Sequence, residues 1–180
     1  EIGKLCRKRG IIFHTDAAQA AATIPLDSHK MHIDIMSLSG HKFYGPKGVG
    51  GLFVRRGVRL AGLLEGGSHE KRLRPGTENV AGIVGMAAAL EIAVRDMAEE
   101  SRRLTKLRDE LAGKLTGALQ DVELNGDPRA GHMLPNTLNV CFHGVDAQSL
   151  LMNLDMEGLC VSPGAACSSG SVEPSPVLIA

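Results

Sequence analysis

Two short apolar runs near the start of the chain each lead directly into polar residues that can do chemistry. The runs are GIIF at 10–13 and HIDIMSLS at 32–39. The polar residues are His14, Thr15, Asp16 and Gln19 after the first run, and Gly40, His41 and Lys42 after the second. Short apolar runs of this kind are typical of buried β-strands. Because ligands of open α/β sheets bind beyond the carboxyl ends of the strands, the pattern predicts an α/β fold with a site at this edge.

The segments that follow extend this unit. GVGGLFVRRG at 48–57 predicts a third strand, and 58–79 predicts an irregular loop. Apolar residues then recur at helical spacing from 80 to about 119. Because that span exceeds one ordinary helix, we expect a kink or two helices that meet near 97–101.

The last part of the chain predicts a smaller α+β unit. The expected elements are a turn at 125–136, a strand at 137–142, a helix at 146–158, and a strand that leads into a Gly/Ser loop at 159–171. The composition changes near 90–100, from strands with polar ends to a leucine-rich helical stretch. We therefore expect two domains, 1–95 and 96–180.

Charge and cysteine usage exclude several classes of protein. Lys plus Arg and Asp plus Glu are both 20, so no net field draws the chain to nucleic acid or to an anionic membrane. No apolar run approaches the roughly 18 residues of a membrane span. The four cysteines include no C-x-x-C pair, and no His cluster stands at ligand spacing, which argues against a metal site and a disulfide framework. A reducing, cytoplasmic compartment is expected.

Lys42 stands where the second strand should end, within SLSGHKFYGPKGVGG. A lysine is usually a solvated surface charge. A lysine at a strand end before a glycine-rich turn is also where a Schiff-base lysine is positioned. The glycines that follow either make room for a bulky planar cofactor or make a tight turn; they are Gly45, Gly48, Gly50 and Gly51. GPKGVGG lacks the spacing of a phosphate P-loop, which argues against nucleotide binding.

Asp16 offers the partner that a pyridoxal phosphate on Lys42 needs. The cofactor is an electron sink only while its pyridine nitrogen is protonated, and a nearby carboxylate holds that proton. The competing interpretation is that Asp16 caps the following turn. Gln19, three residues on, would face the same side of a helical turn and could hydrogen-bond the phenolic oxygen of the ring.

Five segments, in order along essentially the whole chain, resemble the cysteine desulfurases of the NifS/IscS type. They are HTDAAQAAATIPLD, DIMSLSGHKFYGPKGVGGLFVRRG, GGSHEKRLRPGTENVAGIVGMAAAL, LPNTLNVCF and GAACSSGSVEPSPVL. The resemblance implies the three-layer α/β fold type I of pyridoxal-phosphate enzymes. In that fold, 1–95 would be the C-terminal half of the large, cofactor-binding domain. The stretch 96–180 would be the small α+β domain with the catalytic cysteine loop.

The resemblance also implies a role for particular residues. Asp16 would pair with the pyridine nitrogen and Gln19 with the ring oxygen. The S-G-H-K motif would hold the phosphate and bind the cofactor covalently through its lysine; its three side chains are Ser39, His41 and Lys42.

Two further residues carry implied roles away from the strand ends. Thr77, in the R-x-G-T motif, would reach the phosphate of the neighbouring subunit's cofactor, which implies a homodimer. Cys167, in GAACSSGS, would accept the substrate's sulfur as a persulfide. Its Gly and Ser neighbours favour a mobile loop. The other cysteines, Cys6, Cys141 and Cys160, are expected to be small buried apolar residues.

The implied activity is removal of sulfur from L-cysteine, which gives L-alanine and an enzyme persulfide for an iron–sulfur cluster scaffold or another acceptor. Alternatives are a selenocysteine lyase, another class V aminotransferase relative, or a cofactor-free folding or interaction unit. The chain lacks an initiator Met, and family members are about twice its length. We therefore expect an internal fragment without the N-terminal phosphate-binding and ring-stacking residues and the C-terminal arginine that holds the substrate carboxylate.

Overall fold

The computed structural model describes residues 1–126, 133–164 and 178. The chain divides into two compact units, Glu1–Ser101 and Arg102–Ala180. The long helix α2, Val80–Ala118, runs through the boundary. The predicted domain boundary at 95/96 stays a prediction, and it falls within the same helix.

The first unit is built on a three-stranded sheet with the order β1-β2-β3. The strands are β1, His14–Asp16, β2, Ile35–Ser39, and β3, Gly50–Val54. β1 and β2 are parallel, whereas β2 and β3 are antiparallel. A short helix, α1, Ile2–Lys8, precedes the sheet. The carboxyl ends of β1 and β2 therefore meet at one edge, as predicted.

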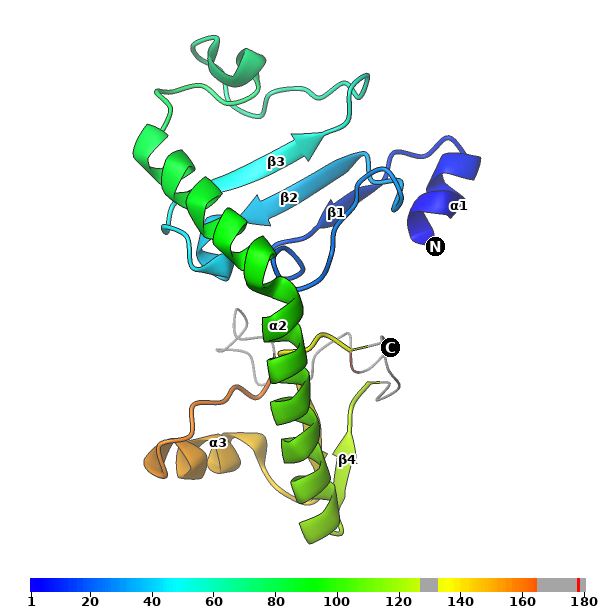
Figure 1. Ribbon diagram of the computed structural model, residues 1–180, viewed down its shortest axis with the longest axis vertical. Helices are drawn as coiled ribbons and strands as arrows, with labels where there is room; N and C mark the ends of the chain where they lie inside the picture. The colour runs from blue at the N-terminus through cyan, green and yellow to red at the C-terminus, as the bar shows by residue number, and fades with distance from the viewer. Residues whose placement is uncertain (127–132, 165–177, 179–180) are drawn as a thin grey trace. The chain divides into compact units, whose positions relative to one another are not determined.

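The two faces of this sheet differ in chemistry. Side chains alternate along a strand, so Leu38 faces the side opposite to Ser37 and Ser39. The N-terminal part of α2 lies across one face (Figure 1). Met86 of α2 reaches that face, because a Cβ built on Gly51 would lie 3.8 Å from its Cε and 4.0 Å from Cδ1 of Leu38. The other face carries His14 and Asp16 of β1 together with Ser37 and Ser39 of β2.

Asp34 ties the three strands together at the start of β2. It is buried, and its carboxylate accepts hydrogen bonds from the backbone N–H of Phe13, at 2.9 Å, and from Nε of Arg55. Its own carbonyl accepts from the backbone N–H of Arg55 at 2.8 Å. The Phe13 hydrogen bond, followed by the Arg55 guanidinium, holds the pKa of Asp34 below its ordinary value.

The second unit contains a two-stranded antiparallel sheet and one further helix. The strands are β4, Val122–Leu124, and β5, Val140–Phe142. The helix is α3, Ala147–Met156, and its N-cap Asp146 accepts from the backbone N–H of Ser149 at 2.8 Å. This hydrogen bond lowers the pKa of Asp146. Capping of this kind explains why the helix begins where the sequence predicts.

Three predictions about individual elements are wrong. The first strand is His14–Asp16, not 10–13, because the carbonyl of Phe13 accepts from the backbone N–H groups of both Asp34 and Ile35. Leu159–Gly164 form no strand, and 165–171 lie outside the described residues. The helical stretch is one continuous helix and not two, because 97–101 contain no Gly or Pro. The alternative prediction of a kink near 97–101 stays a prediction.

No helix in the described part of the chain is long and apolar enough to cross a bilayer.

Candidate active site

The carboxyl edge of the β1–β2 pair gathers most of the predicted site residues. Asp16 is the last residue of β1 and the register partner of Ser37. Ser39 is the last residue of β2, and His41 and Lys42 follow it in a 3₁₀ turn, Gly40–Phe43. Because β1 and β2 are parallel, Asp16 and Ser39 leave the sheet at the same edge.

The turn after β2 closes on itself. The backbone N–H of Gly45 donates to the carbonyl of Gly40 at 2.9 Å, and Tyr44 between them is left-handed, with φ of 66°. Oγ of Ser39 and Nδ1 of His41 lie 3.0 Å apart, at hydrogen-bond distance. Lys42 is exposed and makes no hydrogen bond or ion pair within the described residues. Its amine is therefore open to a ligand.

The glycines of this segment allow close backbone contacts within the turn and at the start of β3. A Cβ on Gly45 would lie 2.8 Å from the carbonyl oxygen of Gly40, and one on Gly50 would lie 2.7 Å from the carbonyl oxygen of Leu38. Gly48 has φ of 77°, a left-handed conformation that favours glycine. Of the two interpretations from the sequence, the tight turn is the one that these contacts bear out.

Asp16 both caps a turn and keeps a free oxygen. Its Oδ1 accepts from the backbone N–H of Ala18 at 2.9 Å, whereas its Oδ2 has no hydrogen bond to the described residues. The N–H of Ala21 donates to the carbonyl of Ala17 at 2.8 Å, and Gln19 lies exposed on this turn. One carboxylate oxygen and the Gln19 amide thus remain available to a ligand.

His14 and Ser37 add a contact beneath the site edge. Nε2 of His14 and Oγ of Ser37 lie 2.8 Å apart, at hydrogen-bond distance across the β1–β2 pair. His14 was a candidate from the sequence, but Ser37 was missed. The sequence pattern that could have identified Ser37 is the two-residue period of a strand, which puts Ser37 on the same face as Ser39.

Thr77 lies in a separate, irregular segment. Nη1 of Arg74 donates to the carbonyls of Gly76, at 2.9 Å, and Thr77, at 3.1 Å. No hydrogen bond among the described residues joins the exposed Thr77 to Asp16, Ser39 or Lys42. The described structure therefore shows no direct hydrogen bond between Thr77 and the site edge of its own chain.

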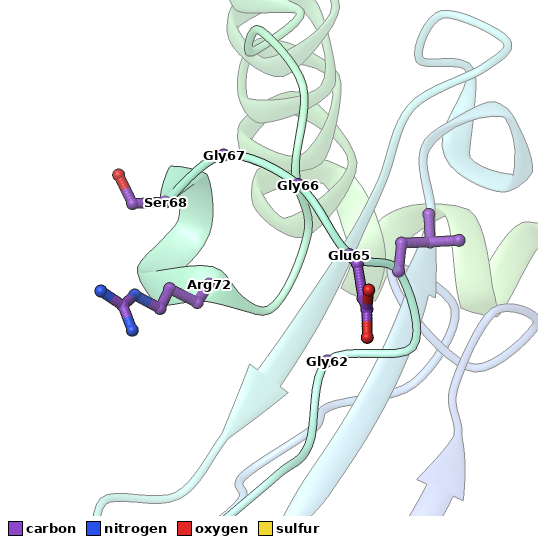
Figure 2. A pocket seen from close by; sticks show the side chains of 7 residues that line it. Gly62, Glu65, Gly66, Gly67, Ser68 and Arg72 are labelled. Carbon is purple, nitrogen blue, oxygen red and sulfur yellow. The ribbon is translucent and has the colours of Figure 1, made fainter.

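The same segment encloses a shallow hollow. Its lining residues are Gly62, Leu64, Glu65, Gly66, Gly67, Ser68 and Arg72. Figure 2 shows the carboxylate of Glu65 and the guanidinium of Arg72 at separate positions around it, pointing in different directions. The two charged groups therefore do not point toward a common ligand atom.

The cysteines differ from expectation. Cys167 lies outside the described residues. The other three are free thiols. The prediction of buried apolar residues is wrong for all of them, since Cys160 is exposed and Cys6 and Cys141 are only half-buried.

The fold and the site edge define an α/β protein of the pyridoxal-phosphate fold type I class. The solved structure of a NifS-like protein from Rickettsia africae ESF-5 matches with a TM-score of 0.84 and 30% identity, over 91% of this chain and 45% of that chain. The chain belongs to the aminotransferase class-V family, whose model matches residues 1–178. This family is pyridoxal-phosphate-dependent.

Two further relatives show which members of the family the chain is similar to. A cysteine desulfurase IscS from Dictyoglomus turgidum is 48% identical over 180 residues, which are 100% of this chain and 45% of that protein. A solved structure described as SspA in complex with cysteine matches with a TM-score of 0.71 and 33% identity, over 99% of this chain and 48% of that chain. The chain thus spans about half the length of the relatives that it matches.

Proposed function

We propose that this chain is the part of a pyridoxal-phosphate-dependent cysteine desulfurase that binds the cofactor and accepts sulfur. The observation that carries the proposal is the shared edge of β1 and β2, where Asp16 and the Ser39–Lys42 turn leave the sheet side by side. The 48% identity to a cysteine desulfurase over the whole chain supports the same activity.

The side chains at this edge fit pyridoxal phosphate by their chemistry. Lys42 supplies an amine without a partner in the described structure, and Asp16 supplies a carboxylate oxygen without one. Ser39 and His41 supply a hydroxyl and an imidazole suited to phosphate oxygens. These side chains would hold three groups of the cofactor: its aldehyde, its pyridine nitrogen and its phosphate.

When bound, pyridoxal phosphate withdraws electrons from the bonds at Cα of an amino acid substrate. Lys42 would hold the cofactor covalently and then move the proton at the substrate's Cα. The carboxylate of Asp16 would keep the proton on the ring nitrogen in place, and the amide of Gln19 would orient the ring oxygen. Ser39 and His41 would anchor the phosphate.

Cys167 is the proposed sulfur acceptor. Its thiolate would attack the sulfur of L-cysteine, form an S–S bond and break the carbon–sulfur bond, which leaves L-alanine after protonation at carbon. The resulting persulfide would pass its sulfur to an iron–sulfur cluster scaffold or another acceptor protein. The solved relative with bound cysteine supports L-cysteine as the substrate.

We also propose a homodimer in the cytoplasm. Thr77 has no hydrogen bond to the site edge of its own chain, which supports a role at a neighbouring subunit's cofactor. Free thiols at Cys6, Cys141 and Cys160 support a reducing compartment.

Borohydride reduction tests the cofactor site. The protein is incubated with pyridoxal phosphate, reduced, digested and mapped by mass spectrometry, and the pyridoxyl group is expected on Lys42. Lys47 is the matched control, because it is exposed and lies in the same turn segment. Lys42→Ala should abolish the adduct, and Lys47→Ala should leave it. Equal labelling of Lys42 and Lys47 would show that this edge is not the cofactor site.

Alanine release from L-cysteine then tests the activity, with selenocysteine as the competing substrate. Cys167→Ser should abolish persulfide formation. A Lys42 adduct without alanine release from either substrate would leave cofactor binding established and overturn the desulfurase activity.

A further inference from the structure

The two-stranded sheet of the second unit has one apolar and one polar face. Its register pairs Glu123 with Cys141. The ladder extends one step, since the backbone N–H of His143 donates to the carbonyl of Asp121 at 3.0 Å. Because paired residues share a face, Cys141 lies with Glu123, His143 and Asp121. The apolar side chains point the other way: Val122, Leu124, Val140 and Phe142.

Cys141 is therefore not in the surroundings that a free cysteine usually occupies. Free cysteines are among the most buried residue types and behave as small apolar groups. Cys141 is half-buried, and the side chains of His143 and Glu123 beside it are 58% and 69% exposed. The sulfur thus lies on the solvent-facing, polar side of the sheet.

Three side chains on this face form a line of contacts. Sγ of Cys141 lies 4.0 Å from Nδ1 of His143. Nε2 of His143 lies 3.4 Å from Oε2 of Glu123. The order is thiol, imidazole, carboxylate, with each ring nitrogen of His143 facing a different partner. No group of His, Cys, Asp or Glu in the described residues is arranged to hold a metal ion, so the line does not converge on a common point.

This order matches the chemical needs of an activated thiol. The thiolate is the species that attacks a disulfide. An imidazole within reach can accept the thiol proton, and a carboxylate on the far ring nitrogen orients the imidazole and stabilises its charged form. Cys141, His143 and Glu123 supply these three roles in sequence.

We propose that Cys141, His143 and Glu123 form a second thiol site at which Cys141 exchanges with low-molecular-weight disulfides. The proposal does not depend on pyridoxal phosphate or on Cys167. The carboxylates of Glu123 and Asp121 share the face of the sulfur, so the favoured reagent is a disulfide that carries ammonium groups. Its positive charge complements the two carboxylates.

The exchange step balances without another reagent. The S–H bond of Cys141 breaks and its proton passes to His143. The sulfur attacks one sulfur of the disulfide, a new S–S bond forms and the old S–S bond breaks. The leaving sulfur takes the electron pair and then a proton. Cys141 is oxidised to a mixed disulfide, and one half of the reagent is reduced to a thiol.

Cystamine is the probe for this site, and the chain contains its own controls. The protein is treated with cystamine for increasing times, quenched with acid and mapped by mass spectrometry at each cysteine. Cys160 is more exposed than Cys141, and no hydrogen bond to its thiol occurs in the described residues. If exposure alone set the rate, Cys160 would react faster.

The expected result is that Cys141 reacts about tenfold faster than Cys160. This rate ratio is smaller than the effect of a general base in a closed active site, because the cluster is open to water. His143→Gln should bring the ratio of the two rates down to about one, and Glu123→Gln should lower it severalfold. Circular dichroism checks that the variants keep their fold. The proposal is overturned if Cys160 reacts as fast as Cys141, or if His143→Gln leaves the ratio unchanged.

Discussion

Asp16, the last residue of β1, is the register partner of Ser37 in the parallel strand β2. Ser37 lies two residues before Ser39, so all three side chains belong to one face of the sheet. The carboxylate proposed for the cofactor nitrogen and the hydroxyl proposed for its phosphate are thus held by adjacent strands. Their separation is set by the β1–β2 hydrogen bonds and not by a flexible loop.

Asp16→Asn should slow alanine formation about 100- to 1,000-fold, the usual cost of losing one preorganised charge partner. The amide still caps the turn at Ala18 but carries no charge for the ring nitrogen. Steady-state alanine release measures the effect. Asp27→Asn is the matched control, because Asp27 also caps a turn, through the N–H groups of His29 and Lys30. Equal losses in both variants would mean that Asp16 acts only as a cap.

The hydrogen bond between His14 and Ser37 should couple β1 to β2. In a double-mutant cycle of His14→Ala and Ser37→Ala, we expect a coupling free energy of about 1 kcal/mol. Urea unfolding of the four proteins measures it. His29→Ala combined with Ser37→Ala is the control pair and should be additive. If the first pair is additive as well, the 2.8 Å contact contributes nothing to stability.

The site edge could be predicted from the sequence because it depends on local patterns. An apolar run followed by Asp16, and a second one followed by Ser39 and Lys42, predict strand ends without any knowledge of distant contacts. The position of β1 could not be predicted in the same way. The backbone N–H of Phe13 donates a hydrogen bond to the carboxylate of Asp34, 21 residues away. Because of this long-range contact, the strand begins at His14 and not at residue 10.

The second unit shows a similar limit. β4 contains only three residues and has no apolar run of its own, since Glu123 divides Val122 from Leu124. Its pairing with β5 makes it a strand, and the same pairing puts Cys141 beside Glu123. A free cysteine on a polar face contradicts the usual burial of the residue, so only the register of the sheet could reveal it.

Asp34 should make stability depend on pH. Its pKa is lowered from the ordinary 3.8 in the folded protein, so its stabilisation is fully present above that value and is lost as the pH falls through the folded pKa. Asp34→Asn should cost about 1.5–3 kcal/mol at pH 7, the usual value for hydrogen bonds to a charged group. The difference from the parent protein should shrink below pH 3.8.

Urea unfolding at pH 7 and at pH 3 measures this difference. Asp155→Asn is the control, because Asp155 is exposed and makes no ion pair within the described residues. It should change stability little at either pH. A cost for Asp34→Asn that is the same at both pH values would mean that the charge of Asp34 is unimportant and that only its shape matters.

Gly45 should be hard to replace in the turn that carries Lys42. A Cβ there would lie 2.8 Å from the carbonyl oxygen of Gly40 and 3.4 Å from Cα of Met86. Both are backbone atoms, so the clash cannot be relieved by a side-chain rotation. Gly45→Ala should lower the free energy of unfolding by about 1–3 kcal/mol. It should also reduce pyridoxyl labelling of Lys42, because the turn would open.

Gly113→Ala is the matched control, since Gly113 lies in α2 and a Cβ there meets nothing within 4 Å. Alanine is the better helix former, so this variant should gain about 0.5–1 kcal/mol. If Gly45→Ala destabilises the protein and Gly113→Ala stabilises it, the loss at Gly45 comes from the steric clash in the turn and not from the general effect of replacing glycine. If Gly45→Ala were also stabilising, the hydrogen bond between Gly45 and Gly40 would not be what keeps the Lys42 turn closed.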